Sequence, residues 1–217
     1  MTTIADVAAR LRQVENGCAP DDGVAWFVRL YFAVTENVGA RERSAFVERL
    51  DVVFANLFFA AVDARTPPRA WAPLFACRAR PHVAPIQFAL CGMNAHINRD
   101  LPVALVQTAA ELGVDLEHAT AAHAEFTAIN GLLAQTEARV KKQFAAGLVG
   151  LADAALGALD DRIAMWDVGR AREAAWVQAQ VLWRLRELPP LERRYLDTLD
   201  RTVGFAGRGL LVPLPAA

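Results

Sequence analysis

Apolar residues recur at helical spacing along almost the whole chain, and this periodicity constrains the fold more than any other feature. Ile4, Val7, Leu11 and Val14, for example, follow the i, i+3, i+4 spacing of an amphipathic helix over residues 4–14. No convincing strand alternation occurs ahead of an apolar tail at residues 210–214. Because a helix with one apolar stripe buries it against other helices, the pattern predicts an all-α fold.

Local start and stop signals divide the chain into about eight helices. Asp21 and Asp22 are suited to cap a helix over residues 24–38, Ser44 opens a helix that runs to about residue 64, and Gly113 ends one that starts at residue 101. Further helices are predicted over residues 71–79, 116–145, 151–159, 163–186 and 191–203, with residues 204–217 as a tail. Without an internal repeat or a low-complexity linker, the sequence predicts a single-domain bundle over residues 1–217.

Composition excludes several classes of partner. The 217 residues are 54% hydrophobic and carry a net charge of −1, without the basic footprint of a nucleic-acid binder. The longest nearly uncharged stretches are too short to span a bilayer, and residues 1–15 lack the apolar core of a signal peptide. The three cysteines are odd in number and widely spaced, which favours reduced thiols in a cytoplasmic protein. The sequence leaves open both whether a cofactor is bound and which oligomeric state the protein adopts.

The main candidate for a functional site is the stretch at residues 87–102, which begins as an apolar run. It then places Asn94, His96, Asn98, Arg99 and Asp100 within seven positions. Polar groups in an apolar helix cost folding free energy unless each finds a partner, and proteins tolerate that cost where a site is built.

Helical geometry divides this cluster into two faces, because residues four apart point the same way. Asn94 and Asn98 form one pair, and His96 and Asp100 form the other. A carboxylate beside an imidazole suits a general base, and the same pair is also suited to hold a metal, with Asp51 as a third ligand. A structural interpretation competes with both. Asp100 lies just before Leu101 and Pro102, where it would cap a helix, and His96 would then be a core histidine.

Other polar residues are weaker candidates. Tyr31, Thr35 and Asn56 lie in apolar helices, either lining a pocket or as satisfied core groups. Arg172, ahead of an apolar Ala-Ala-Trp run, is interpreted as a surface residue, with an inward position beside Asp100 as the alternative. A solvated helix face, rather than a metal site, is the interpretation of three polar residues that lie close together in the sequence: His118, His123 and Glu125.

The chain resembles a family of uncharacterised, mainly actinobacterial proteins, the DUF5995 family. The resemblance rests on residues 22–27, 50–56, 71–75, 130–133, 171–176 and the tail from 199 to 213, and most specifically on residues 92–102. The family has no assigned function, so no catalytic residue is carried over. The resemblance implies that the following residues belong to one shared pattern: Asp22, Tyr31, Thr35, Asn56, His96, Asn98 and Asp100.

Together these features predict a small enzyme that acts on a largely apolar organic substrate held in an apolar pocket. His96 is the predicted general acid or base and Asp100 its orienting partner, while Tyr31, Thr35, Asn56, Asn94 and Asn98 are the predicted substrate-binding residues. A cyclisation, dehydration or hydrolysis in secondary metabolism fits these roles. The alternatives are a metal-dependent hydrolase or oxygenase that uses His96, Asp100 and Asp51, and a non-catalytic ligand-binding protein. The sequence lacks the motifs of dinucleotide-binding enzymes, P-loop enzymes, serine hydrolases and zinc peptidases.

Overall fold

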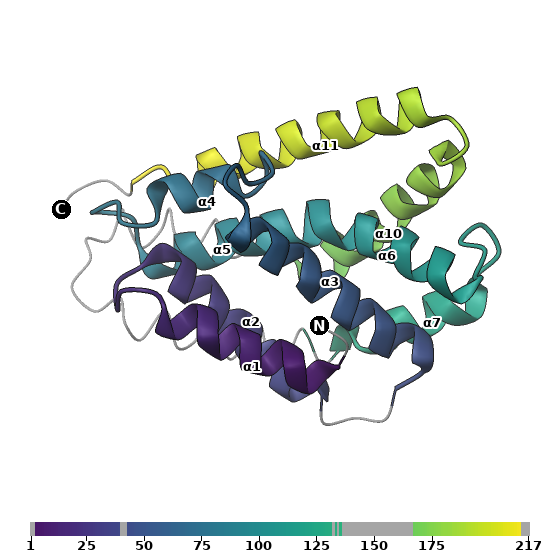
Figure 1. The fold of residues 1–217 in the computed structure, drawn as a ribbon, viewed down its shortest axis with the longest axis horizontal. Coiled ribbons are helices and arrows are strands. Elements are labelled where there is room, and N and C mark those ends of the chain that lie inside the picture. Colours follow the sequence, from purple (N-terminus) through teal and green to yellow (C-terminus); the bar gives the residue numbers. More distant parts are fainter. Residues whose placement is uncertain (1–2, 40–42, 132, 134, 136–166, 214–217) are drawn as a thin grey trace.

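The computed structural model describes residues 3–39, 43–131, 133, 135 and 167–213 of the protein (Figure 1). In this part of the chain every regular element is a helix, which confirms the all-α prediction. The elements are α1 (Ile4–Asn16), α2 (Gly23–Gly39), α3 (Ala45–Asp63), α4 (Ala72–Cys77), α5 (Pro85–Ala95), the π-helical turn η1 (His96–Asp100), α6 (Leu101–Leu112), α7 (Thr120–Ala128), α10 (Val168–Leu185) and α11 (Pro189–Leu210). With α5, η1 and α6 counted as one continuous helix, the described residues contain eight helices, as predicted.

The predicted capping residues are found at the starts of α2 and α3. The Val24 amide donates to the Asp22 carboxylate over 2.8 Å, and the Val47 amide donates to the Ser44 hydroxyl over 3.3 Å. At the end of α6, Gly113 adopts the left-handed conformation, with φ of 66°, which glycine enters without steric penalty. Each of these bonds or conformations satisfies backbone groups that a helix end leaves without an intrahelical partner.

The continuous helix α5–η1–α6 forms the centre of the bundle (Figure 1). Its first half, α5, packs against α2 and α11, and its second half, α6, packs against α3 and α10. Almost every residue of α5 is buried, as expected of a helix with apolar residues on most of its faces. The polar cluster therefore lies where four other helices converge.

A π-helical turn joins the two halves at His96–Asp100. Its signature is the hydrogen bond from the Leu101 amide to the His96 carbonyl, which spans five residues instead of four. Pro102 follows directly. In a regular α-helix the ring of Pro102 would clash with the carbonyl of Asn98, four residues earlier, and the wider turn relieves that clash. Pro102 thus widens the helix without ending it.

The prediction for the last helix was wrong at both ends. The structure places α11 at Pro189–Leu210 instead of residues 191–203, and Pro189 and Pro190 start it. The glycines that suggested a tail permit close packing. A Cβ on Gly204 would lie 2.4 Å from the carbonyl oxygen of Arg69. The apolar run that follows α11 begins with Leu211, which is buried in the protein's own core.

Two other predictions overlap residues that the structure does not describe. The helix predicted over residues 116–145 begins in the structure only at Thr120, with α7, and after a turn at residue 129 the described residues 130, 131, 133 and 135 are again helical. The end of the predicted helix, at residues 136–145, lies outside the described residues. The helix predicted over residues 151–159 lies outside them entirely. Residues 163–166 of the helix predicted over residues 163–186 also lie outside them, and the described part of that prediction is α10. No helix in the described part of the chain has both the length and the apolar character needed to cross a membrane.

Candidate functional site

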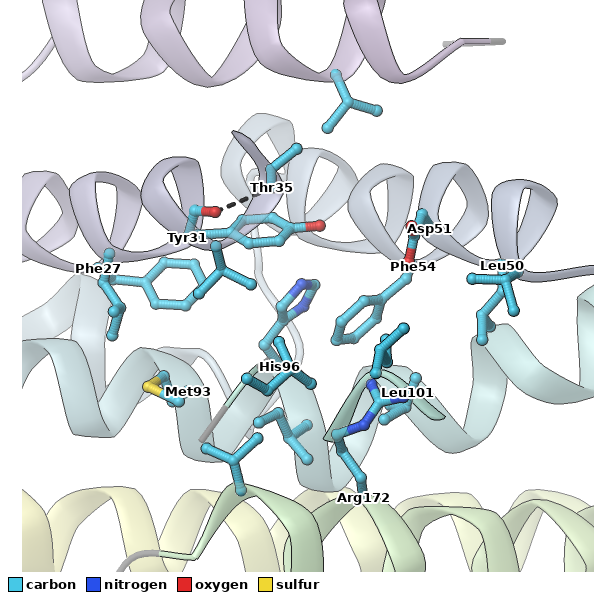
Figure 2. A pocket seen from close by; sticks show the side chains of 18 of the residues that line it. Phe27, Tyr31, Thr35, Leu50, Asp51, Phe54, Met93, His96, Leu101 and Arg172 are labelled. Carbon is cyan, nitrogen blue, oxygen red and sulfur yellow. Dashed lines mark hydrogen bonds between the residues drawn. The ribbon is translucent and has the colours of Figure 1, made fainter. Parts of the chain in front are cut away.

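An apolar cavity of about 120 Å³ lies beside η1, between α2, α3, α5, α6 and α10 (Figure 2). Aliphatic and aromatic side chains form most of its wall, among them Phe27, Leu30, Phe54, Met93 and Leu101. The polar residues that line it are Tyr31, Thr35, Arg43, Asp51, His96 and Arg172. A mostly apolar concavity with a few convergent polar groups is the usual form of a small-molecule site.

The structure brings His96 and Asp100 together. Both side chains are buried, and Nδ1 of His96 lies 3.3 Å from Oδ2 of Asp100. An ionised carboxylate only accepts hydrogen bonds, so this contact requires the proton of a neutral imidazole to be on Nδ1. Nε2 is then the basic nitrogen of His96. It is buried and has no hydrogen-bond partner among the described residues.

Asp100 is held by two further donors. The indole Nε1 of Trp71 donates to Oδ2 over 2.9 Å, and the guanidinium of Arg99 donates to Oδ1 over 2.8 Å. The Asp100 side chain makes no capping bond to the start of α6, so the interpretation of this residue as a helix cap is wrong. The carboxylate instead fixes the orientation of the imidazole, as second-layer carboxylates do in acid–base sites.

Aromatic rings enclose the imidazole of His96. The Phe54 ring stacks on it with centroids 3.5 Å apart, and the Tyr31 ring meets it edge-on at 4.6 Å. This burial lowers the pKa of His96 below its ordinary value of 6.5, against the opposing effect of the Asp100 carboxylate. His96 is therefore neutral at pH 7, which is the form that accepts a proton.

Tyr31 and Thr35 line the cavity from α2. The Thr35 hydroxyl donates to the Tyr31 carbonyl over 2.9 Å, so its proton is engaged by the backbone. Figure 2 shows the phenol group of Tyr31 lying above His96, with its hydroxyl directed towards Asp51. Burial, together with the Asp51 and Asp100 carboxylates, raises the pKa of Tyr31 well above 10, so Tyr31 remains a neutral hydrogen-bond donor.

The other three predicted binding residues are absent from the cavity wall. The side-chain amide of Asn94 donates to the carbonyl of Val203 on α11 over 2.9 Å, and the amide of Asn98 donates to the Asn94 side chain over 3.0 Å. Asn94 thus ties the end of α5 to α11, and Asn98 on η1 is joined to α11 through Asn94. Asn56, on α3, is half-buried and likewise does not line the cavity.

A second charged group, at Arg43, Asp51 and Arg172, lines the cavity. Asp51 accepts a hydrogen bond from Arg43. Burial raises the pKa of Asp51 to about 6, although the charges of Arg43 and Arg172 act in the opposite direction. Burial lowers the pKa of Arg172 to about 10, which leaves its guanidinium charged at pH 7.

The interpretation of Arg172 as a surface residue was wrong. It is 6% exposed and lies near Asp51, whereas Arg99 is the residue that pairs with Asp100. Its guanidinium donates to the Asn130 side chain and the Phe126 carbonyl over 2.8 and 2.7 Å, and stacks on the Phe126 ring. A signal for this placement was available in the sequence. Arg172 shares the helical stripe of Ala175, Trp176, Ala179, Leu182 and Trp183, all of which are buried.

The alternative metal ligands His96, Asp100 and Asp51 do not form a group. No three His, Cys, Asp or Glu side chains are clustered as metal ligands would be, as far as the described residues show. On the surface, His118 pairs with Asp115 and His123 with Glu173. Both oxygens of Asp100 are occupied by the donors Arg99 and Trp71.

Comparison with known proteins places the chain in a family. No curated protein and no solved structure matches it. One family model, described as a family of unknown function (DUF5995), matches residues 4–213 of the 217. This match covers every helix described above, including the polar turn and the cavity. The chain therefore belongs to the DUF5995 family.

Proposed function

We propose that the protein is an enzyme that binds a small, largely apolar organic substrate in the cavity beside η1 and uses His96 as its general base. One observation carries the proposal. His96 lines the cavity, and its Nε2 is buried without a partner in the part of the chain that the structure describes, while Nδ1 contacts the buried carboxylate of Asp100. An unsatisfied buried nitrogen is costly, and it is retained where a reaction uses it.

The surrounding groups support proton transfer at this nitrogen. Nε2 takes a proton from an O–H, N–H or acidic C–H group of the substrate, and the resulting imidazolium is stabilised by the Asp100 carboxylate. The neutral phenol of Tyr31 is suited to donate a hydrogen bond to a substrate oxygen that gains negative charge. The proton then returns from Nε2 to the product or the leaving group. Cyclisation, dehydration and hydrolysis all use such a step.

The cavity limits the size of the substrate. An apolar protein cavity of roughly 150 Å³ holds a benzene molecule, and this one measures about 120 Å³. A substrate with an apolar body of about that size fits without a large rearrangement. A place in secondary metabolism and a cytoplasmic location stay predictions from the sequence.

A non-catalytic ligand-binding protein is the second candidate, and the enclosure of the imidazole favours it. Phe54 and Tyr31 contact the ring closely, so a substrate reaches Nε2 only if one of these side chains moves. A protein that only binds its ligand requires no such movement.

A turnover screen separates the two candidates. The purified protein and the His96→Gln variant are incubated with a library of small organic molecules, and substrate loss and binding are measured by mass spectrometry and calorimetry. We expect the wild-type protein to convert at least one compound. The His96→Gln variant should bind that compound but not convert it. Binding without conversion across the library would favour the non-catalytic protein, and conversion at equal rates by both proteins would exclude His96 as the base.

A further inference from the structure

Three charged side chains interrupt the otherwise apolar wall of the cavity: Arg43, Asp51 and Arg172. The side chain of Arg43 is 7% exposed and that of Arg172 is also buried. Among the described residues that line the cavity, two guanidinium groups face one carboxylate, which is an excess of one positive charge. Glu48 and Glu173 act on Asp51 and Arg172 from outside this lining. An excess positive charge is expensive in an apolar environment unless an anion pairs with it.

The hydrogen-bond donors of this group are incompletely used. The Nε of Arg43 is buried, and no described residue accepts a hydrogen bond from it. Arg172 donates through Nε and Nη2 to Asn130 and Phe126, and none of the described residues accepts a bond from its Nη1. In Figure 2 the guanidinium of Arg172 extends from α10 towards Phe54 and Asp51. The excess positive charge and the unused N–H donors of Arg43 and Arg172 therefore lie at the same end of the cavity.

We infer that this end of the cavity binds the anionic head of the ligand, and that the ligand is a small organic carboxylate whose apolar body extends towards His96. The inference rests on the proposed function, because it assumes that the cavity is the ligand site. A carboxylate has two acceptor oxygens, which suit guanidinium donors, and a single negative charge, which cancels the excess charge. A cation would be repelled by the two arginines, and a doubly charged phosphate would exceed the available positive charge beside Asp51.

The charge of Asp51 makes this binding depend on pH. The groups that act on Asp51 are Arg43, Glu48 on its own helix, and Arg172 on α10, and Tyr31 faces it from α2 as a neutral phenol. Asp51, with a pKa of about 6, loses its negative charge as the pH falls from 7.5 to 5.5. Organic carboxylates, whose pKa values are about 4, stay ionised over this interval. The affinity for a carboxylate should therefore rise as the pH falls through 6.

Calorimetry with matched ligands tests the inference. The probes are hexanoate and 3-phenylpropanoate, each paired with its neutral amide, which has nearly the same shape. At pH 6 at least one carboxylate should bind about tenfold more tightly than its amide, as expected for charge-assisted hydrogen bonds in an apolar site. The Asp51→Asn variant should bind the carboxylate more tightly than the wild-type protein at pH 7.5, and its affinity should rise less than that of the wild-type protein as the pH falls from 7.5 to 5.5.

Removal of an arginine charge should have the opposite effect on carboxylate binding to the removal of the Asp51 charge. Arg172→Met should weaken carboxylate binding about tenfold and change amide binding by less than about threefold. Arg172 also donates a hydrogen bond to the Phe126 carbonyl on α7, so its replacement changes the packing of α7 as well as the charge of the cavity. Arg43→Met therefore provides a second variant, with the same expected result. Arg184→Met, on the same helix α10 but 70% exposed in its side chain, serves as the matched control and should leave both affinities unchanged.

The outcomes separate the two proposals. Equal binding of a carboxylate and its amide would overturn the anionic head group and leave the apolar cavity as the ligand site. Failure of every probe to bind would overturn both the head group and the cavity as the ligand site. A loss of carboxylate affinity in Asp51→Asn would also contradict the inference, since removal of a negative charge cannot weaken an anion site by electrostatics.

Discussion

Replacement of Asp100 by alanine is expected to lower the free energy of unfolding by about 3–5 kcal/mol, the range found when one partner of a buried charge pair is removed. Asp100 is fully buried. Its carboxylate accepts from Trp71 and Arg99 and contacts His96. Without it, an indole N–H and an imidazole N–H are buried without acceptors, and each such loss is costly.

Chemical denaturation at pH 7 measures this effect. Asp100→Asn keeps one acceptor oxygen and should therefore destabilise the protein less than Asp100→Ala. Asp197→Ala is the control, because the Asp197 side chain is 51% exposed and its ion pairs with Arg69 and Arg201 lie on the surface. Exposed pairs contribute up to about 1 kcal/mol. An Asp100→Ala variant as stable as Asp197→Ala would show that the buried network does not hold η1 in place.

Replacement of His96 by glutamine is expected to lower kcat by about 10²–10⁴-fold on any substrate that the wild-type protein converts, the usual contribution of a general base. KM should change little, because the cavity wall that binds the substrate is retained. The Asp100→Asn variant should also lose activity, since an amide N–H₂ facing Nδ1 would favour the tautomer whose proton is on Nε2.

The pH profile gives a second measure of the same role. Burial places the pKa of His96 below 6.5, so kcat at saturating substrate should be constant near pH 7 and fall as the pH drops through that lower pKa. His118→Gln removes an exposed histidine that pairs with Asp115 and should leave both rate and profile unchanged. Full activity in His96→Gln would remove His96 from the mechanism.

Local sequence signals predicted the features that depend on local geometry. The i, i+4 spacing of His96 and Asp100 was enough to expect their contact, because neighbouring helical turns bring such residues together even through a π-helical turn. The caps at Asp22 and Ser44 and the stop at Gly113 were predictable for the same reason. Each of these features is determined within a few residues along the chain.

Features that depend on distant contacts were not predicted. Arg172 on α10 is brought into one cavity with Arg43 and Asp51, which lie just before α3 and within it, and no spacing in the sequence links the two segments. The partner of the Asn94 side chain, and through it that of Asn98, depends on where α11 packs. That packing depends in turn on the close approach of Gly204 to the backbone at Arg69. A glycine that permits helix packing and a glycine that breaks a helix look alike in a sequence.

The protonation of His96 is the most direct test of the proposed chemistry, and it requires no substrate. Nitrogen-15 NMR of the imidazole side chains, with His96→Gln to assign the signal, reports which ring nitrogen carries the proton. The account predicts a neutral ring at pH 7 with the proton on Nδ1, an unprotonated Nε2, and a titration midpoint below 6.5. A proton on Nε2 at pH 7, whether in the other neutral tautomer or in the imidazolium form, would contradict the assignment of His96 as the general base.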